Sequence, residues 1–305
     1  MRFVLGAATA DAEGEWVAEP NRYRLYIVKS CPFAHRPRIL RVLLGLEEEV
    51  AITEAQGQDM VGFFFDPVEP NFGKCHLKDI YTELTERHSY PPVQRYSVPL
   101  LVDCVTKKGI SNESLDLCWH FVELYHAKNG NVATMKDVEI IPVAPDICLK
   151  IPNRLEEQEA LLKEMEEINE NIVLTPYKFL FGDAAAKEHM RSKMYEELAK
   201  LEQVVDKQTF LGGRNTLSMA DCVLWPALFR FDNVYARQFG LSGKTLREDF
   251  PKLHGYVTGI YQGVATIKND GDLESVVRLY WQSEILSKTA GNDPKADVPP
   301  VMDFM

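Results

Sequence analysis

The sequence lacks the long apolar runs and the excess of positive charge that would identify several large classes of protein. No segment approaches the roughly 18 consecutive apolar residues that a membrane-spanning helix requires. Acidic residues outnumber basic ones, 45 to 34, and the formal net charge of −11 disfavours broad attraction to nucleic acid or to anionic membranes. We therefore expect neither nucleic acid nor a membrane as a partner.

Paired cysteines are also missing. None of the six cysteines belongs to a Cys-x-x-Cys pair, and they follow no regular spacing with the histidines. Neither a zinc site nor a disulfide framework is expected, so we predict no metal cofactor. Residues 1–16 carry Asp11, Glu13 and Glu15, which fits neither a secretory signal nor a transit peptide. The expected location is the reducing cytoplasm.

One thiol has an informative position. Residues 31–36 read Cys-Pro-Phe-Ala-His-Arg and directly follow the apolar run 23–28. Proline fits the first helical position because it has no N–H to lose, which places Cys31 at the helix N-cap, where backbone N–H groups and the helix dipole favour a thiolate. Ala34 occupies the position of the second sulfur in a dithiol motif. Cys31 is therefore predicted to be a nucleophile that needs an external thiol such as glutathione; the alternative is a small buried apolar residue.

The hydrophobic pattern predicts an α/β part followed by an all-helical part. A strand over 23–28 leads into a helix that ends near residue 46, and a short strand follows at 50–52. A long connection over 54–96 contains one helix near 77–87, and two strands and a helix complete this part. The expected organisation is an N-terminal extension (1–22), a first domain (23–127), a linker (128–152), a helical domain (153–285) and a tail (286–305) that lies on the surface or is disordered.

Capping signals mark two helices of the second half. Asn153 and Glu156 predict one capping box, and Ser218 and Asp221 predict another. The apolar helix after Ser218 is expected to form the core of the helical domain.

The strand, the Cys-Pro helix start and Val98-Pro99 before a later strand resemble a thioredoxin-like domain. With its helical second half, the whole chain is similar to a glutathione transferase. The resemblance implies a mixed four-stranded sheet in the first domain, a helical bundle in the second, glutathione as co-substrate and a homodimer. It further implies that the Val98–Pro99 peptide is cis and presents backbone groups to the cysteinyl part of glutathione.

The same resemblance supplies further glutathione contacts. Glu113 and Ser114 match the acidic residue and serine that hold the γ-glutamyl end, since a carboxylate pairs with the ammonium while a helix N-terminus and a hydroxyl take the carboxylate. Phe33 forms an aromatic wall beside glutathione. Arg36 either serves the glycyl carboxylate or pairs within the fold.

Within the superfamily, the closest likeness is to the xi class, the glutathionyl-hydroquinone reductases, and it covers roughly residues 23–283. It is carried by Asn112-Glu113-Ser114, by Asn169-Glu170-Asn171 leading to Tyr177-Lys178-Phe179-Leu180-Phe181, by the run Arg230 to Tyr235 and by residues 279–284. Tyr177 and Tyr280 match substrate-site tyrosines that donate hydrogen bonds to phenolic oxygens, and their alternative role is helix packing. The family has Trp where this chain has Phe33, and Leu279 and Glu284 replace two histidines.

Two alternatives remain open. Cys-Pro-Phe-Ala-x-Arg also resembles the active-site start of omega-class transferases, and this resemblance implies reduction of dehydroascorbate and small mixed disulfides. A non-catalytic binding or assembly module of the same fold is the other alternative. The xi-class and omega-class interpretations share one prediction, which is glutathione-dependent thiol transfer by Cys31.

Overall fold

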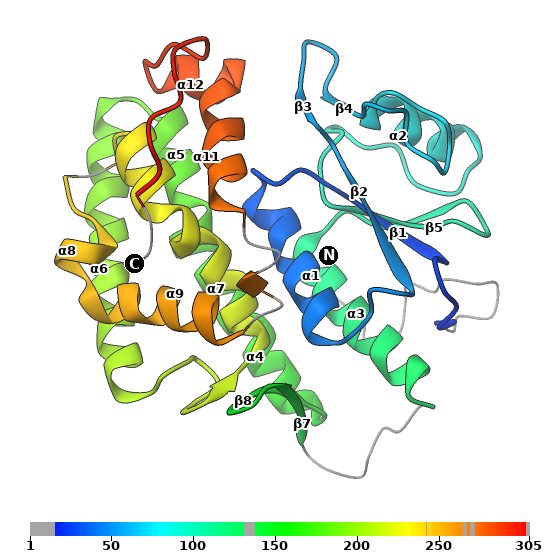
Figure 1. The fold of residues 1–305 in the computed structure, drawn as a ribbon, viewed down its shortest axis with the longest axis horizontal. Coiled ribbons are helices and arrows are strands. Elements are labelled where there is room, and N and C mark those ends of the chain that lie inside the picture. The colour runs from blue at the N-terminus through cyan, green and yellow to red at the C-terminus, as the bar shows by residue number, and fades with distance from the viewer. Residues whose placement is uncertain (1–15, 131–137, 242, 265–266, 269–271, 303–305) are drawn as a thin grey trace. The chain divides into compact units, whose positions relative to one another are not determined.

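The structure is a computed structural model that describes residues 16–130, 138–241, 243–264, 267–268 and 272–302. The chain forms two compact units, which comprise residues 1–133 and 134–305 (Figure 1). The boundary between these units falls inside the segment 128–152 that the sequence predicts as a linker. Each unit is described by itself.

Unit 1 is built on a four-stranded sheet. Its strands are β1 (Tyr23–Ile27), β2 (Val50–Glu54), β5 (Leu100–Asp103) and β6 (Lys108–Ser111), in the order β2-β1-β5-β6. β1 pairs with β2 in parallel and with β5 in antiparallel orientation, and β5 and β6 are antiparallel. The predicted mixed four-stranded sheet is therefore confirmed.

Two long helices of unit 1 pack against each other, α1 (Pro32–Leu43) and α3 (Ser114–Lys128). The apolar face predicted for α1 is buried, and Ile39 and Leu40 are at most 1% exposed. The described part of the N-terminal extension lies on α3, because the Trp16 indole donates to the Glu123 carboxylate at 2.8 Å. Residues 1–15 of the predicted extension lie outside the described residues.

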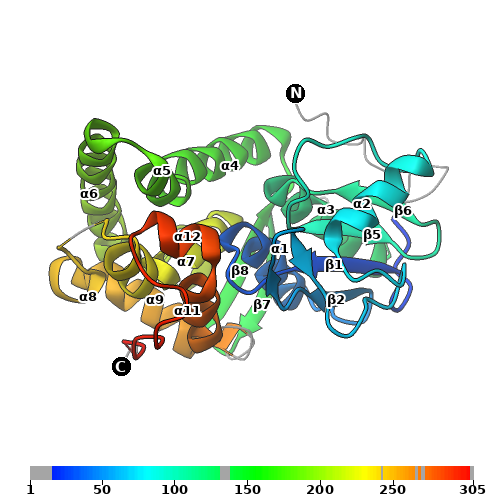
Figure 2. The ribbon, with the colours of Figure 1, turned by 90° about the horizontal axis from the view of Figure 1, so that it is seen from above.

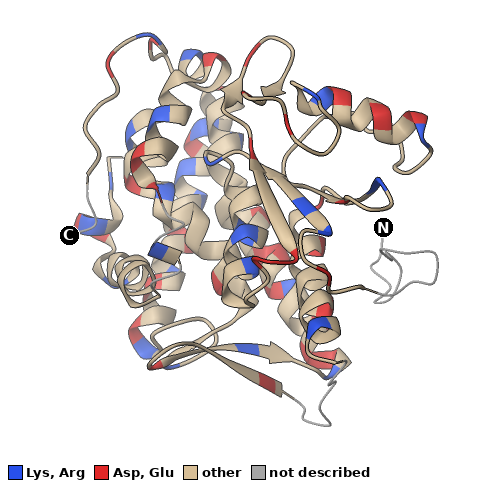
Figure 3. Cartoon of the chain, turned by 45° about the vertical axis from the view of Figure 1, so that its right-hand side comes forward, with Lys and Arg blue, Asp and Glu red and all other residues tan. Residues whose placement is uncertain are grey.

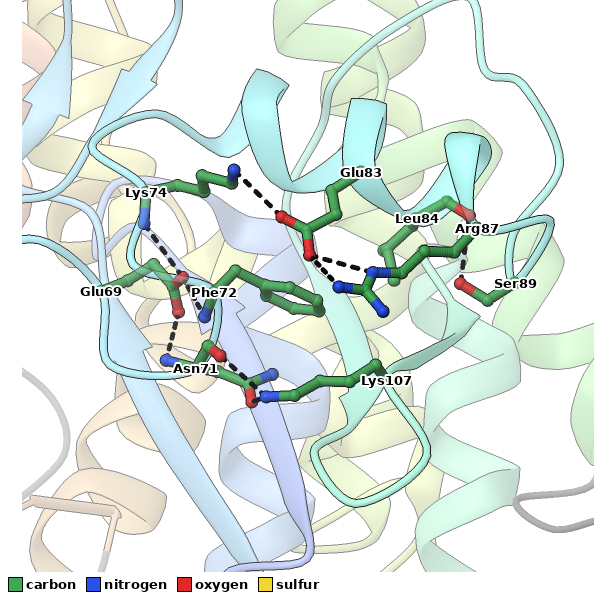
Figure 4. Close-up of polar contacts among 9 residues, drawn as sticks. All are labelled: Glu69, Asn71, Phe72, Lys74, Glu83, Leu84, Arg87, Ser89 and Lys107. Atoms are coloured by element: carbon green, nitrogen blue, oxygen red, sulfur yellow. Dashed lines mark hydrogen bonds and ion pairs between the residues drawn. The ribbon is translucent and has the colours of Figure 1, made fainter.

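The long connection of unit 1 is anchored to the sheet. It contains β3 (Gly57–Gln58), β4 (Phe63–Phe64) and the predicted helix, α2 (Leu77–Glu86). The Glu69 carboxylate is buried and accepts hydrogen bonds from three backbone N–H groups of its own loop, those of Asn71 (2.9 Å), Phe72 (2.6 Å) and Lys74 (3.3 Å) (Figure 4). The Tyr26 hydroxyl of β1 also donates to Glu69, at 2.8 Å. One buried carboxylate thus ties the loop to the central strand.

Charged residues of both signs are interspersed along the helices (Figure 3). On α2, Glu83 lies between Lys74, at 3.0 Å, and Arg87, at 2.8 Å (Figure 4). Within the described residues, no helix is both long and apolar enough to cross a bilayer.

Unit 2 begins with strands that the sequence did not indicate. The predicted linker ends in a hairpin of β7 (Val138–Ala144) and β8 (Ile147–Pro152), and the short strand β9 (Thr216–Leu217) pairs with β8 in parallel. Ile141, Leu149 and Ile151 are buried, whereas Pro142 within β7 obscures the strand pattern. Residues 131–137 of the linker lie outside the described part of the chain.

The remainder of unit 2 is helical, as predicted (Figure 2). Its elements are α4 (Leu155–Ile168), η1 (Asn169–Val173), α5 (Thr175–Phe181), α6 (Ala184–Lys207), α7 (Met219–Arg230), η2 (Phe231–Gln238), α8 (Leu246–Asp249), α9 (Pro251–Gly263), α11 (Leu273–Gln282) and α12 (Glu284–Thr289). Every residue of α7 is buried, so the prediction that this helix forms the core is confirmed.

One of the two predicted capping boxes is present. Ser218 and Asp221 cap α7 reciprocally, and the Ser218 N–H donates to the Asp221 carboxylate at 2.7 Å. The box predicted at Asn153 is wrong, because α4 begins one residue later than that box requires, with Arg154 at its N-cap and no side-chain cap.

The C-terminal tail lies along η2 as far as residue 302. The Asn233 side chain pairs with the backbone of Met302 twice, donating to its carbonyl at 3.0 Å and accepting from its N–H at 2.8 Å. Arg237 donates to the Pro300 carbonyl at 2.7 Å, and the Trp281 indole donates to that of Ala296 at 3.2 Å. Residues 303–305 of the predicted tail lie outside the described residues.

Candidate active site

Cys31 is the N-cap residue of α1, as its position before Pro32 predicts. Its backbone is extended, with φ −74° and ψ 116°, and its sulfur accepts a hydrogen bond from the Ala34 N–H at 3.4 Å. The side chain is half-buried and not disulfide-bonded. A sulfur at this place receives the backbone N–H groups at the positive end of the helix, which favours its thiolate form.

The Val98 carbonyl lies on another side of the same sulfur. The Cys31 thiol donates to this oxygen across 3.5 Å. The Val98–Pro99 peptide bond is cis, as the resemblance implies. The sulfur therefore lies between a donor that favours the thiolate, the Ala34 N–H, and an acceptor that favours the thiol, the Val98 carbonyl.

Arg36 connects the first turn of α1 to the first turn of α3. Its guanidinium is 1% exposed and donates to the Ser114 hydroxyl at 3.0 Å. It also lies over the Phe33 ring, 4.8 Å from the ring centroid. Of the two roles expected for Arg36, pairing within the fold is the one that these contacts describe. Since Ser114 accepts from Arg36, its own O–H is directed elsewhere and can serve a ligand carboxylate.

Glu113 and Asp116 place two carboxyl groups at the N-terminus of α3. Glu113 is the exposed N-cap residue of the helix. Burial, and after it the Glu113 charge, raise the pKa of Asp116 to about 6, although His120 acts in the opposite direction. Sequence reasoning missed Asp116, because its burial depends on tertiary packing that no local motif reports.

Tyr177 of α5 and Tyr280 of α11 meet in unit 2, although 103 positions separate them. Their hydroxyl oxygens are 2.5 Å apart, and either of them can be the donor. Tyr280 is 1% exposed and Tyr177 is half-buried, so Tyr177 is the more accessible of the two residues.

Two further aromatic residues complete this group, and sequence reasoning did not assign them. Phe239 packs edge-on against both tyrosines, with centroid distances of 5.9 Å to Tyr177 and 5.8 Å to Tyr280. Tyr235 lies 6.0 Å from Tyr177. We call Tyr177, Tyr235, Phe239 and Tyr280 the aromatic cluster.

Both π-helical segments coincide with runs that carry the resemblance. η1 covers Asn169–Val173, directly before α5 and Tyr177, and η2 covers Phe231–Gln238, which includes Tyr235. π-Helical turns are rare and often occur at functional sites, where they redirect side chains. A hydrophobic periodicity of 3.6 residues does not distinguish them from ordinary helix.

The structure therefore assembles two groups of the predicted residues. Cys31, Phe33, Arg36, Val98, Pro99, Glu113 and Ser114 belong to unit 1, and Tyr177 and Tyr280 belong to unit 2. Among the described residues, no three His, Cys, Asp or Glu side chains gather in a way that would hold a metal ion.

Comparison with known proteins identifies the helical unit. Residues 152–259 match the family model described as "Glutathione S-transferase, C-terminal domain". Glutathionyl-hydroquinone reductase YqjG of Escherichia coli is 28% identical over 270 residues, which cover 87% of this chain and 76% of that protein. Glutathione S-transferase omega-like 2 of Schizosaccharomyces pombe is 25% identical over 305 residues, with 94% and 88% covered.

Solved structures extend the similarity to the whole fold. The glutathione-S-transferase Xi from Phanerochaete chrysosporium matches with a TM-score of 0.77 at 23% identity, over 99% of this chain and 98% of that chain. The glutathione-bound structure of Escherichia coli YqjG matches with a TM-score of 0.73 at 25% identity, over 94% of this chain and 87% of that one. The predicted combination of a thioredoxin-like unit with a helical unit is thereby confirmed.

Proposed function

We propose that the chain, whose residues 152–259 match the C-terminal domain of glutathione S-transferases and which is similar over most of its length to a glutathionyl-hydroquinone reductase, is an enzyme of that superfamily. It would transfer thiols with glutathione as co-substrate and Cys31 as nucleophile. The observation that carries the proposal is the Cys31 sulfur at the N-cap of α1, in contact with the Ala34 N–H. A sulfur held in this way is activated by the backbone without any second cysteine. Glutathione then supplies the second thiol.

We propose that the substrates are glutathionyl-hydroquinones. The Cys31 thiolate attacks the sulfur of the bound glutathionyl group, the carbon–sulfur bond breaks, and the aromatic carbon takes the electron pair and a proton. A Cys31–glutathione disulfide and a hydroquinone result. A second glutathione thiolate attacks this disulfide, which releases oxidised glutathione and regenerates the Cys31 thiolate. The YqjG relative is named a glutathionyl-hydroquinone reductase, which supports this substrate class.

Glutathione would be held by the groups around Cys31. Val98 and Pro99 would offer backbone groups to its cysteinyl part, and Phe33 would cover one side. Glu113 would pair with its α-ammonium, while Ser114, oriented by Arg36 at 3.0 Å, would donate to its α-carboxylate. The glutathione-bound structure of YqjG supports a glutathione site in this fold.

The aromatic cluster would bind the phenolic ring. If Tyr280 donates to Tyr177, the Tyr177 O–H can be directed at a phenolic oxygen where negative charge develops during carbon–sulfur cleavage. The buried position of Tyr280 suits this supporting role.

A second candidate function is omega-like reduction of small disulfides or dehydroascorbate. Phe33 in the active-site motif and the omega-like relative favour it. A binding module without turnover is the candidate of another class, and the presence of Cys31, Val98, Glu113 and Ser114 argues against it.

A cytoplasmic homodimer remains our prediction for the assembly and its location, and light scattering after gel filtration tests the oligomeric state.

The decisive experiment is intact mass after incubation with a glutathionyl-hydroquinone, with hydroquinone release followed in parallel. The wild type is compared with Cys31→Ser and with Cys75→Ser, a matched control at an exposed cysteine of the same unit. We expect one glutathione adduct that requires Cys31, forms together with hydroquinone and disappears when glutathione is added.

The other outcomes separate the alternatives. An adduct formed only from oxidised glutathione or hydroxyethyl disulfide would replace the hydroquinone proposal by the omega-like function. Failure of every donor to form an adduct in the folded wild type would leave the binding module as the better description.

A further inference from the structure

The loop that carries the Val98 carbonyl is held by hydrogen bonds from two directions. Tyr81 of α2 donates its hydroxyl to the Ser97 carbonyl at 2.8 Å. Asn112, which directly precedes the Glu113–Ser114 pair, donates its side-chain amide to the Ser97 hydroxyl at 3.4 Å. Tyr90 in turn donates to the Asn112 side-chain oxygen at 3.0 Å. Ser97 is thus fixed at both its backbone and its side chain.

The two tyrosines are well placed to remain donors. Their rings meet edge to face with centroids 6.0 Å apart, and Tyr81 is 1% exposed. Burial raises the pKa of Tyr90 to about 12 and also raises that of Tyr81, where hydrogen bonding to Asn112 and Ser97 acts in the opposite direction. Both hydroxyls therefore keep their protons at neutral pH.

The loop acts on the reacting sulfur through one residue. Ser97 is bonded covalently to Val98, whose carbonyl oxygen accepts from the Cys31 thiol at 3.5 Å. The partial negative charge of this oxygen stabilises the thiol and opposes the thiolate. The distance between the Val98 oxygen and the Cys31 sulfur therefore influences the reactivity of the thiol. The same backbone segment is the one that would pair with glutathione.

We propose that Tyr81, Tyr90 and Asn112 are positioning residues that hold the Ser97–Pro99 loop in the geometry required for glutathione binding, at some cost to the reactivity of the unliganded thiol. This inference rests on the proposed function and deepens it. None of the three residues touches the sulfur itself, so their effect is exerted through Ser97 and Val98. Two residues of the long connection over 54–96, Tyr81 and Tyr90, thereby support the candidate active site.

The proposal predicts that glutathione binding becomes weaker while alkylation of Cys31 becomes faster. In Tyr81→Phe and in Asn112→Ala, a looser loop should raise KM for glutathione about five- to tenfold, as the loss of one or two hydrogen bonds implies, with kcat kept within about twofold. The same loosening removes the carbonyl from the sulfur, so iodoacetamide should alkylate Cys31 about twofold faster at pH 6. Mass spectrometry of the Cys31 peptide separates this thiol from the other five.

Tyr96→Phe is the matched control. Tyr96 also packs against the Tyr81 ring, at 5.7 Å, but it is 42% exposed and its hydroxyl takes no part in the bonds to Ser97. We expect it to change neither KM nor the alkylation rate. Tyr90→Phe, which removes only the bond to Asn112, should show a smaller effect in the same directions, and thermal unfolding checks that each variant is folded.

The outcomes separate this inference from the proposed function. Unchanged KM and alkylation in folded Tyr81→Phe and Asn112→Ala, or equal changes in Tyr96→Phe, would overturn the positioning role. Slower alkylation in these variants would also overturn it, because general damage to the site would weaken glutathione binding and slow Cys31 alkylation together. If the wild type consumed no glutathione, the proposed function would fail, and the alkylation rates alone would still decide how the loop acts on Cys31.

Discussion

At the scale of one residue, Asp116 makes the free energy of unfolding depend on pH. Its pKa is raised to about 6, chiefly by burial, so between about pH 4 and pH 6 the folded protein holds a proton that the unfolded chain releases. The unfolded state then binds fewer protons, and this carboxyl lowers the free energy of unfolding as pH rises through that window. Above it, Asp116 is a persistent destabilising charge.

Asp116→Asn should therefore stabilise the protein at neutral pH. We expect a gain of about 1 kcal/mol at pH 7 after allowance for solvent screening of a half-exposed group, and almost none at pH 4. Urea unfolding of both proteins at pH 4, 5, 6 and 7 measures the difference. A constant difference across these pH values would contradict the assignment of the titration to Asp116.

Gly109 shows how closely one backbone position constrains the loop beside it. A Cβ at Gly109 would lie 2.4 Å from Cδ2 and 3.0 Å from Cβ of Tyr90, so the whole tyrosine side chain would have to move. Gly109→Ala should cost about 1–3 kcal/mol of stability, as overpacked sites do, and should weaken the Tyr90–Asn112 hydrogen bond.

Gly255→Ala is the control, and we expect it to raise stability where Gly109→Ala lowers it. Gly255 lies in the exposed part of α9, where a Cβ meets nothing within 4 Å. Alanine has the higher helix propensity, so we expect a gain of about 0.5–1 kcal/mol. Denaturant unfolding measures both variants, and a similar change in the two would show that local packing at Gly109 is not the cause.

At the scale of elements, Asp221 joins three segments of unit 2. Besides capping α7, its buried carboxylate accepts from the Leu211 N–H at 2.9 Å and from the Tyr256 hydroxyl of α9 at 2.8 Å. Burial raises the pKa of Asp221, while these hydrogen bonds oppose the rise. The segment before β9, the start of α7 and the middle of α9 therefore share one acceptor.

Asp221→Ala should cost more than the loss of an ordinary cap. It leaves the buried Ser218 N–H and the buried Tyr256 hydroxyl without this acceptor, so we expect about 3 kcal/mol of destabilisation. Asp183→Ala is the matched comparison, because Asp183 caps α6 from an exposed position with a single hydrogen bond of 2.8 Å, and its loss should cost about 1 kcal/mol. Equal losses in thermal unfolding would refute the central role of Asp221.

Local signals account for the elements that the sequence predicted well. Cys31 could be placed at an N-cap because Pro32 and the preceding apolar run suffice, and Ser218 with Asp221 is a complete capping signal. The hairpin of β7 and β8 could not be predicted, since Pro142 interrupts its pattern and its pairing with β9 involves residues far along the chain. The π-helical segments could not be predicted either, because about one extra residue per turn changes the apolar pattern of a short segment too little to be detected.

At the scale of the whole molecule, the fold class followed from the order of its elements, but the aromatic cluster of unit 2 did not. Tyr177 and Tyr280 were reached only through the resemblance, and nothing local predicts that they meet. Their contact depends on the packing of α5, α11 and η2. Phe239 and Tyr235 can be recognised as members of the aromatic cluster only after that packing is known. Long-range contacts are the part of a site that a single sequence hides.

The division of the chain into two compact units predicts that unit 2 folds by itself. Every residue of α7 is buried, and this helix contacts α4, η1, η2, α9 and α11 of its own unit. The tail supplies Met302 and Pro300 to η2. A fragment of residues 138–302 should therefore unfold cooperatively and give a helical circular dichroism spectrum.

The tail provides the sharper half of this prediction. A fragment that ends at residue 289 keeps the described helices of unit 2 but loses the hydrogen bond from Trp281 to Ala296. It also loses four hydrogen bonds between the tail and η2, namely the two between Asn233 and Met302, the one from Arg237 to Pro300 and the one from Asn292 to Gln238. Its unfolding midpoint should fall by about 5 °C, since roughly 1–2 kcal/mol of hydrogen bonding is removed. Because these bonds all end on η2, fluorescence of the aromatic cluster should change as well. Equal midpoints for the two fragments would mean that η2 is held by the helices around it, and a non-cooperative 138–302 fragment would mean that unit 2 requires unit 1 to fold.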